Sequence, residues 1–493
     1  MQFTGITTIK GDMNIFNTIR KETMDFTGKT AVIEGDSLLS YGRLFSCADM
    51  TASSLRGKGV ARFHRVGLLC GDSIDYLTTS LAVLSLSAVI VPISPDQADS
   101  EIRDIIERIS LDYLIFERGT YHEEGSEILP SEGLLKKELR MLKRDVPELS
   151  DSEYYRINPA FIRFSSGTTG ASKGVVLSHE AILDRTDAAD KGLRITSEDT
   201  VLWVLSMSFH FVVTILLFLR RAATIVLCGH GFPESLIEGI TNHKGTFIYA
   251  SPFHYNVLAR SGLVSPRSLS NIRMTVSTAM KLPEAIAVQF SAKFGFELAE
   301  AYGIIEVGLP FLNLDAESRI RGSVGRPLPD YEVKIFKKDS DGVGEIYIKG
   351  KGMLDAYFSP WQIRKSILKK GWFKTGDLGR INSNGHLTIV GRKKDVINFV
   401  GMKVFPFEVE SVLNEYPLVK ESMVYGVSHP QYGQLPIARL VLKNGAASDL
   451  DLNDLRRFCY HKMSQYKVPK DFQVVDALPI TASGKVKREN TPH

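Results

Sequence analysis

The chain has 493 residues, which exceeds the size at which a single hydrophobic core normally divides, so two or more domains are expected. Its 60 lysines and arginines nearly balance 56 aspartates and glutamates, and the net charge of +4 is too mild to favour nucleic acid as a partner. The 4 cysteines form no CxxC pair, so neither a disulfide framework nor a zinc site is indicated, and reduced thiols in the cytoplasm are expected.

The N-terminal part of the chain alternates short apolar runs with helical periodicity. Residues 1–12 show no secretory pattern, and no role is assigned to them. Strands are predicted at residues 31–33, 65–70 and 87–93. Helices are predicted at residues 41–55, 73–86 and 96–109, and surface loop and helix over residues 117–153. Strands that alternate with helices favour parallel β–α units, and therefore an α/β fold.

Residues 161–180, FIRFSSGTTGASKGVVLSHE, concentrate groups that can bind phosphate. Hydroxyls and glycines share one short loop, at Ser165, Ser166, Gly167, Thr168, Thr169 and Gly170. Lys173 adds a positive charge, and a glycine-rich backbone can surround phosphate oxygens with N–H groups. The loop is not a Walker loop, because Lys173 is followed by Gly174 instead of Ser or Thr. A polar surface turn is the alternative interpretation.

Residues 201–219, VLWVLSMSFHFVVTILLFL, contain no acid, lysine or arginine and are long enough to suggest a membrane span. Ser206, Ser208 and His210 interrupt the apolar run, and Arg220 follows it directly. A buried strand, a turn over residues 206–210 and a buried helix are therefore predicted instead of a membrane span.

The last third of the chain changes character. Residues 331–336 and 344–349 alternate polar and apolar side chains, as half-buried antiparallel strands do. After Gly391 a smaller unit begins. It is predicted to contain strands near residues 422–427 and 437–441 and a helix over residues 450–462.

The string SSGTTGASKG resembles the phosphate loop of the adenylate-forming superfamily, which includes acyl-CoA synthetases, aryl-CoA ligases, adenylation domains and luciferases. Further family-like strings follow in the family's order: YGIIE at 302–306, TGDL at 375–378, GRKKD at 391–395 and ITASGK at 480–485. The chain most resembles a stand-alone acyl- or aryl-CoA ligase. The resemblance implies a large N-terminal domain of layered sheets and helices, residues 1–391, and a small mobile α+β C-terminal domain, residues 392–493.

The resemblance also implies how ATP is bound. Residues 165–170 and Lys173 would hold the β- and γ-phosphates. Tyr302, beside Gly303, would stack on adenine, and Ala279 and Met280 take the place of the family's Gly-Ala pair along the base.

Four charged residues match the family's ribose, metal and catalytic positions. Asp377, assisted by Arg392, would accept hydrogen bonds from the ribose hydroxyls. Glu306 would hold Mg²⁺ through a carboxylate oxygen, the ligand type that this cation prefers. Lys485 would bridge the substrate carboxylate and the α-phosphate, a task suited to a compact cation on a long stem. Without the ordered motifs, each of these side chains would be interpreted as an ordinary solvated or capping residue.

The second half-reaction implied by the family transfers the acyl group to the thiol of coenzyme A. Lys394 occupies the hinge position about which the C-terminal domain swings, and Gly401 lies in the loop expected beside the pantetheine tunnel. His210 occupies the position of a gating histidine or aromatic residue. A satisfied core histidine is the alternative for His210.

One departure from the family pattern concerns the metal region. Ile305 stands where a threonine is usual, and an isoleucine cannot hydrogen-bond. The sequence therefore predicts slower adenylation, not a different fold. Smaller departures are Ser172, Ala356 and the Ala279-Met280 pair.

The substrate is predicted to be an apolar carboxylic acid, because residues 209–215 offer no acid to pair with an amino group. The expected pocket draws on Phe211, Val212, Tyr249, Ala250, Ser251 and Ile304, which favours a fatty, branched or aryl acid. A ligase that charges a separate phosphopantetheinyl carrier protein is the alternative, and a nucleotide-binding relative that has lost catalysis is a third possibility. Neither nucleic acid nor a membrane span is expected.

Overall fold

The computed structural model describes residues 13–121, 124–129, 136–147, 149, 152–164, 173–314, 320–443, 450–480 and 486. One sheet has eight strands. In spatial order these are β15 (Gly308–Leu312), β14 (Ala299–Ile304), β13 (Met274–Ser277), β12 (Phe247–Ala250), β10 (Thr200–Trp203), β11 (Thr224–Leu227), β1 (Thr30–Glu34) and β2 (Ser37–Ser40). The strands from β14 to β1 are parallel, and the two edge strands are antiparallel to their neighbours.

A second sheet has nine strands. In spatial order these are β19 (Gln362–Ile363), β18 (Ala356–Phe358), β9 (Gly174–Ser178), β8 (Pro159–Phe164), β4 (Val89–Ile93), β3 (Arg65–Leu69), β5 (Tyr113–Glu117), β7 (Leu139–Lys143) and β6 (Glu127–Ile128). Its central strands β8, β4, β3 and β5 are parallel. Both large sheets therefore present the carboxyl ends of several parallel strands, where α/β proteins bind their ligands.

Two smaller sheets follow along the chain. The first is antiparallel and contains β16 (Tyr331–Phe336), β17 (Gly344–Gly350), β20 (Phe373–Ile381) and β21 (Leu387–Arg392). The second contains β23 (Met402–Val404), β22 (Ile397–Phe399), β25 (Gly433–Leu442) and β24 (Val419–His429), with β26 (Asp471–Val474) paired to β25. The second small sheet has an apolar cluster of its own, which includes Val404, Leu413, Val424 and Leu455.

The helices of the first half are α1 (Ile15–Glu22), α2 (Tyr41–Gly57), α3 (Ile74–Ser85), α4 (Asp99–Ile109), α5 (Ser152–Arg156), α6 (His179–Leu193), α7 (Met207–His210) and α8 (Leu216–Arg220). Those of the second half are α9 (Glu234–Thr241), α10 (Pro252–Arg260), α11 (Glu284–Phe294), α12 (Arg364–Ile367), α13 (Pro406–Leu413) and α14 (Leu452–Lys462). Short 3₁₀ segments occur at Met24–Phe26, Pro266–Leu269, Lys393–Asp395 and Gln465–Lys467, and a π-helical segment at Phe211–Ile215. Ser40, Ser73 and Ser178 cap α2, α3 and α6 with their hydroxyls, which fixes where these helices begin.

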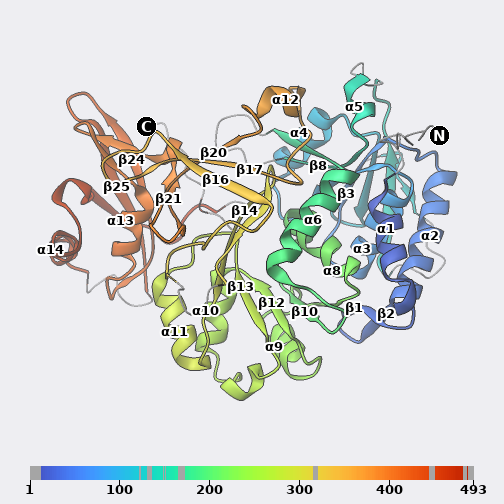
Figure 1. The fold of residues 1–493 in the computed structure, drawn as a ribbon, viewed down its shortest axis with the longest axis horizontal. Coiled ribbons are helices and arrows are strands. Elements are labelled where there is room, and N and C mark those ends of the chain that lie inside the picture. Colours follow the sequence, from blue (N-terminus) through green and yellow to red (C-terminus); the bar gives the residue numbers. More distant parts are fainter. Residues whose placement is uncertain are drawn as a thin grey trace, which may run out of the picture.

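The main apolar core lies between the two large sheets. It combines buried side chains of both sheets, such as Phe161 and Val201, with those of intervening helices, such as Leu77, Ile182 and Leu217. Figure 1 shows α6 and α8 in the middle of this layer, and the orange and red C-terminal elements β24, β25, α13 and α14 as a separate lobe. The predicted α/β class is confirmed, with a large N-terminal and a smaller C-terminal part. The boundary at residues 391 and 392 stays a prediction.

Most predicted elements are present, and residues 117–153 are the main difference. The prediction there was surface loop and helix, but β7 pairs along its whole length with β5. Leu139 and Met141 are buried on one face of β7. The basic residues Arg140 and Lys143 made this segment look like a surface loop in the sequence, so its period-2 pattern was not recognised.

Residues 201–219 contain the predicted buried strand, β10, and a buried helical stretch. The expected turn is wrong in part, because a helix already begins at Met207 and continues through the π-helical segment into α8. None of the helices built from the described residues combines the length and the apolar character that a membrane crossing requires.

Candidate active site

The carboxyl ends of the two large sheets meet at a few side chains. Asp72, after β3 of the nine-stranded sheet, accepts hydrogen bonds from the Met207 N–H, after β10 of the other sheet, at 2.9 and 3.1 Å. The Nε2 atom of His230, after β11, lies 2.9 Å from the Asp72 carbonyl oxygen. Arg163, near the end of β8, donates from Nη1 to the carbonyl oxygen of Phe209. The loops that follow the parallel strands therefore form one continuous region.

Three of the predicted nucleotide-binding residues contact each other. The Tyr302 hydroxyl, on β14, donates a hydrogen bond to Oδ2 of Asp377, on β20. Nε of Arg392, at the end of β21, lies 2.6 Å from Oδ1 of the same carboxylate. Burial, and then the Asp377 charge, raise the pKa of Tyr302 well above its usual range, so this hydroxyl stays a donor. A carboxylate oxygen has two lone pairs, so it can accept more than one hydrogen bond.

Glu306 lies in the tight turn between β14 and β15. The Tyr357 hydroxyl, from β18, donates to Glu306 Oε1 at 3.4 Å, and the Lys173 ammonium lies 4.8 Å from the centre of the Tyr357 ring. Burial raises the pKa of Glu306, and the nearby positive charges of Arg163 and Arg392 partly oppose that shift. A bound cation would favour the ionised carboxylate at this position.

Arg185, on α6, is hydrogen-bonded to the backbone of this turn. Its Nη1 donates to the Ile305 carbonyl oxygen at 3.1 Å, while Nε and Nη2 donate to the Gly352 carbonyl oxygen at 3.0 and 2.6 Å. The Leu354 N–H in turn donates to the Glu306 carbonyl oxygen at 2.8 Å. The backbone around Glu306 is thus fixed independently of the side chain of Ile305.

The expected adenine strip lies in the loop after β13. Ala279 has a φ of +71°, a left-handed conformation that glycine adopts without strain, and this agrees with the glycine usual in the family at this position. Met280 is exposed. Gly303 has a different constraint, because a Cβ atom there would lie 2.5 Å from the Gly308 carbonyl oxygen.

His210 lies at the junction of α7 and the π-helical segment. Its ring packs edge-on against Trp203, with 6.3 Å between ring centroids, and its carbonyl oxygen accepts a hydrogen bond from the Thr214 hydroxyl. Short π-helical segments occur often at functional sites. His210 is only partly buried, and its gating role stays a prediction.

Lys394 and Gly401 belong to the C-terminal part. Lys394 lies in the 3₁₀ turn Lys393–Asp395, with its ammonium 3.9 Å from the Asp395 carboxylate. Gly401 has a φ of +78° in the hairpin turn between β22 and β23. This backbone conformation alone accounts for a glycine, and a Cβ atom at this position would contact nothing within 4 Å.

Several predicted residues lie outside the described part of the chain: Ser165, Ser166, Gly167, Thr168, Thr169, Gly170 and Lys485. Of the expected acid pocket, four residues are buried in the packed core: Phe211, Val212, Tyr249 and Ala250. Ser251 and Ile304 remain partly exposed.

Sequence reasoning missed Arg163, Tyr357 and Arg185. A signal existed for Arg163, since it is a charged residue inside an apolar strand directly before the phosphate-loop motif. Nothing in the local sequence indicates that Tyr357 meets Glu306, because that contact joins residues far apart in the chain.

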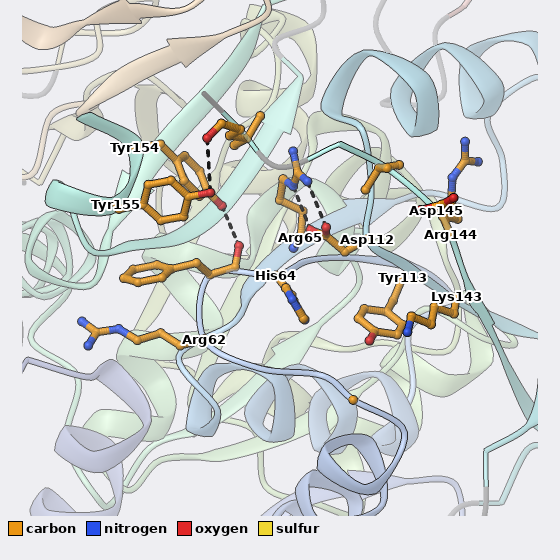
Figure 2. Close-up of a pocket in the computed structure, with 14 residues that line it drawn as sticks. Arg62, His64, Arg65, Asp112, Tyr113, Lys143, Arg144, Asp145, Tyr154 and Tyr155 are labelled. Carbon is orange, nitrogen blue, oxygen red and sulfur yellow. Dashed lines mark hydrogen bonds and ion pairs between the residues drawn. The ribbon is translucent and has the colours of Figure 1, made fainter. Parts of the chain in front are cut away.

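A cavity of about 420 Å³ lies at the amino ends of β3 and β5, the opposite edge from this site (Figure 2). Its Arg65 forms two hydrogen bonds with Asp112, at 2.9 and 3.0 Å, and its Arg144 donates to Glu107 at 2.8 Å. The Tyr154 hydroxyl donates to the Phe63 carbonyl oxygen at 3.0 Å. Because these arginines are already paired, the cavity is interpreted as a structural joint between strands.

The described residues offer several contacts for the nucleoside of ATP but only one carboxylate, Glu306, for a magnesium ion. Within the described ranges, no group of three or more His, Cys, Asp or Glu side chains is placed to hold a metal. Magnesium is, however, often held by one or two carboxylates together with substrate phosphates, and Glu306 is suited to that task. The donors and acceptors of Tyr302, Asp377 and Arg392 suit a nucleoside.

Two family models match most of the chain. Residues 19–358 match the family model of the AMP-binding enzyme, and residues 408–485 match the AMP-binding enzyme C-terminal domain. A mitochondrial medium-chain acyl-CoA ligase of Mus musculus is 25% identical over 98% of this chain and 89% of its own length. A 3-hydroxybenzoate–CoA ligase of an Aromatoleum species is 29% identical over 93% and 92%.

Solved structures show the same fold. The ATP-bound MatB from Rhodopseudomonas palustris is 23% identical and superposes with a TM-score of 0.82 over 96% of this chain and 97% of its own. The predictions of an adenylate-forming fold and of an enzyme of the acid–thiol ligase type are confirmed at the level of the family. The family model covers more than half of the chain, and the chain therefore belongs to the AMP-binding enzyme family.

Proposed function

We propose that this protein is an AMP-forming acid–CoA ligase that uses ATP and Mg²⁺. It activates a fatty, branched or aryl carboxylic acid to an acyl-adenylate and then transfers the acyl group to the thiol of coenzyme A. The observation that carries the proposal is the contact of Tyr302, Asp377 and Arg392, which come from three strands of two sheets and whose donors and acceptors suit a nucleoside. Relatives named as medium-chain acyl-CoA and 3-hydroxybenzoate–CoA ligases support it.

In the first step, a carboxylate oxygen of the acid forms a bond to the α-phosphorus, and the bond to pyrophosphate breaks. Bound ATP supplies the electrophilic phosphorus, and bound Mg²⁺ offsets the phosphate charge. Asp377 and Arg392 orient the ribose, and Tyr302 lies against the base. Lys173 and Lys485 contribute positive charge where negative charge develops, which lowers the barrier most effectively in a site that is already ordered. Glu306 holds the metal through its carboxylate.

In the second step, the thiolate of coenzyme A attacks the acyl carbon, and AMP leaves with both electrons of the broken bond. The proposed division at residues 391 and 392 puts Lys394 at the hinge and Gly401 on the part that moves. His210, partly exposed beside Trp203, is proposed to gate the path of the thiol. A holo-carrier protein in place of coenzyme A is the second candidate acceptor, since it presents the same phosphopantetheine thiol.

The test is pyrophosphate release from ATP and Mg²⁺ across fatty, branched and aryl acids, with and without coenzyme A. Release that depends on the acid, with a thioester formed when coenzyme A is present, is the expected result. Pyrophosphate release without a thioester would favour a carrier protein as the acceptor of the acyl group, and a holo-carrier protein would be assayed next. ATP binding without release for any acid would contradict the ligase and favour a relative that has lost catalysis.

A further inference from the structure

Arg163 is a charged residue in an otherwise apolar strand. In β8 its neighbours Phe161 and Ile162 are fully buried, and Arg163 lies opposite Val175 of β9. Side chains alternate along a strand, so Arg163 shares a face with Phe161. Phe161 and Val175 belong to the core between the two large sheets, whereas Ile162 packs on the other side. The guanidinium therefore projects into the layer where the carboxyl ends of both sheets meet.

The hydrogen bonds of Arg163 are incomplete. Nη1 donates to the Phe209 carbonyl oxygen, and the guanidinium carbon lies 5.6 Å from the centre of the Phe209 ring. Nε is buried and has no acceptor among the described residues. Burial lowers the pKa of Arg163 to about 10, and the charge of Glu306 only partly opposes this shift. Arg163 as a whole residue nevertheless keeps some exposure to solvent.

The three arginines that are most deeply buried among the described residues are fully engaged. Arg65 binds both oxygens of Asp112, and Arg220 donates to both oxygens of Glu22 at 2.8 Å. Arg185 directs three nitrogens at two carbonyl oxygens. Buried charges in proteins are normally paired in this way. Arg163 combines two features within the described ranges: it forms no ion pair, and it leaves a buried donor unused. Arg144 also has a buried Nε without an acceptor, but it is paired with Glu107.

We propose that Arg163 binds a second anionic group of the acid substrate, so that the preferred substrate is an apolar acid that also carries a carboxylate away from the reacting one. The proposal rests on the proposed function and refines its substrate class. The planar fork of a guanidinium matches a carboxylate in two parallel hydrogen bonds, and Nε belongs to that fork. Phe209 directly precedes His210, so the group would be held beside the proposed gate. No acid occurs at residues 209–215, and Glu306 is the carboxylate whose charge acts on Arg163.

The test uses pairs of acids that differ at one remote group. A dicarboxylic acid is compared with the monocarboxylic acid of equal length that ends in methyl, and isophthalate with 3-methylbenzoate. Each pair is assayed with the wild type, with Arg163→Met, which keeps the apolar stem, and with Arg163→Lys, which keeps the charge. Arg62→Met, at the opposite edge of the sheet, is the matched control.

The wild type is expected to prefer one dicarboxylate over its methyl partner in kcat/KM. Arg163→Met is expected to lower kcat/KM for that dicarboxylate about 10- to 100-fold, mainly through KM, as for a lost hydrogen bond to a charged group. The methyl partner should lose much less than the dicarboxylate, because it has no second carboxylate to bind, and Arg163→Lys should restore part of the preference. Preference of the wild type for the methyl acids, or an equal loss for both members of a pair, would overturn the proposal.

A failure of the proposed ligase function can be distinguished from a failure of the proposed role of Arg163. Calorimetric binding of the same acids, measured in the presence of AMP, does not require turnover. If no acid releases pyrophosphate but the dicarboxylate binds more tightly to the wild type than to Arg163→Met, the proposed function fails and the role of Arg163 stands. If binding shows no difference between the two proteins, the role of Arg163 is refuted whatever the catalytic result.

Discussion

Asp72 joins the two large sheets, and its replacement by asparagine should change how stability depends on pH. The carboxylate accepts the Met207 N–H, and the amide oxygen of Asp72→Asn can accept the same hydrogen bond. Burial raises the pKa of Asp72 from its usual 3.8 to about 6. Met207, His230 and Lys137 oppose the shift, and Asp96 adds to it. At pH values between 3.8 and about 6, the folded protein therefore holds a proton on Asp72 that the unfolded chain has lost.

The sign of the effect follows from proton binding. Between the unfolded and folded pKa values the unfolded state binds fewer protons, so the free energy of unfolding decreases as the pH rises. A pKa raised from 3.8 to about 6 corresponds to about 3 kcal/mol, since one pKa unit is worth ~1.4 kcal/mol. Above pH 6 this loss in the free energy of unfolding stays constant. Asp72→Asn carries no such penalty, so its stability relative to the wild type should rise by about 3 kcal/mol from acidic to neutral pH.

Urea unfolding at a series of pH values measures this difference. Tryptophan fluorescence reports the unfolding, and one of the three tryptophans, Trp203, is fully buried four residues before Met207. Asp49→Asn, the same substitution at an exposed acid of α2, is the control for the change of side chain itself. A difference between Asp72→Asn and the wild type that is the same at every pH would refute the reasoning.

Three further predictions concern the reaction. Asp377→Asn should raise the KM for ATP about tenfold or more, because it weakens the charge-assisted contact with Arg392, and an unchanged KM in pyrophosphate-release kinetics would contradict the assigned role. Ile305→Thr should increase the rate of adenylation, measured in a single turnover, and no gain would remove Ile305 as the cause of slow turnover. Lys485→Met should reduce adenylate formation about 100-fold or more but leave thioester formation from added acyl-adenylate intact, and equal loss in both steps would contradict it.

The ordered motifs predicted the family because each short string has local requirements that the sequence displays directly. Gly303, at which a Cβ atom would lie 2.5 Å from the Gly308 carbonyl oxygen, is an example in which the backbone itself dictates the residue type. Strands such as β3 and β4 were also predictable, because burial on both faces produces continuous apolar runs. β7 was not predicted, because its pairing with β5 depends on a neighbour more than 20 residues away.

The sequence by itself determined the α/β class and the family, and it predicted Tyr302, Asp377 and Arg392 as a nucleotide-binding set. Only the tertiary structure decided that the Tyr302 hydroxyl meets Asp377, that Tyr357 meets Glu306, and that Arg163 points inward with a donor unused. The physical reason is that a motif records what one segment requires of its own backbone and charge. Hydrogen bonds between strands of different sheets depend instead on packing, which no single segment of the sequence encodes.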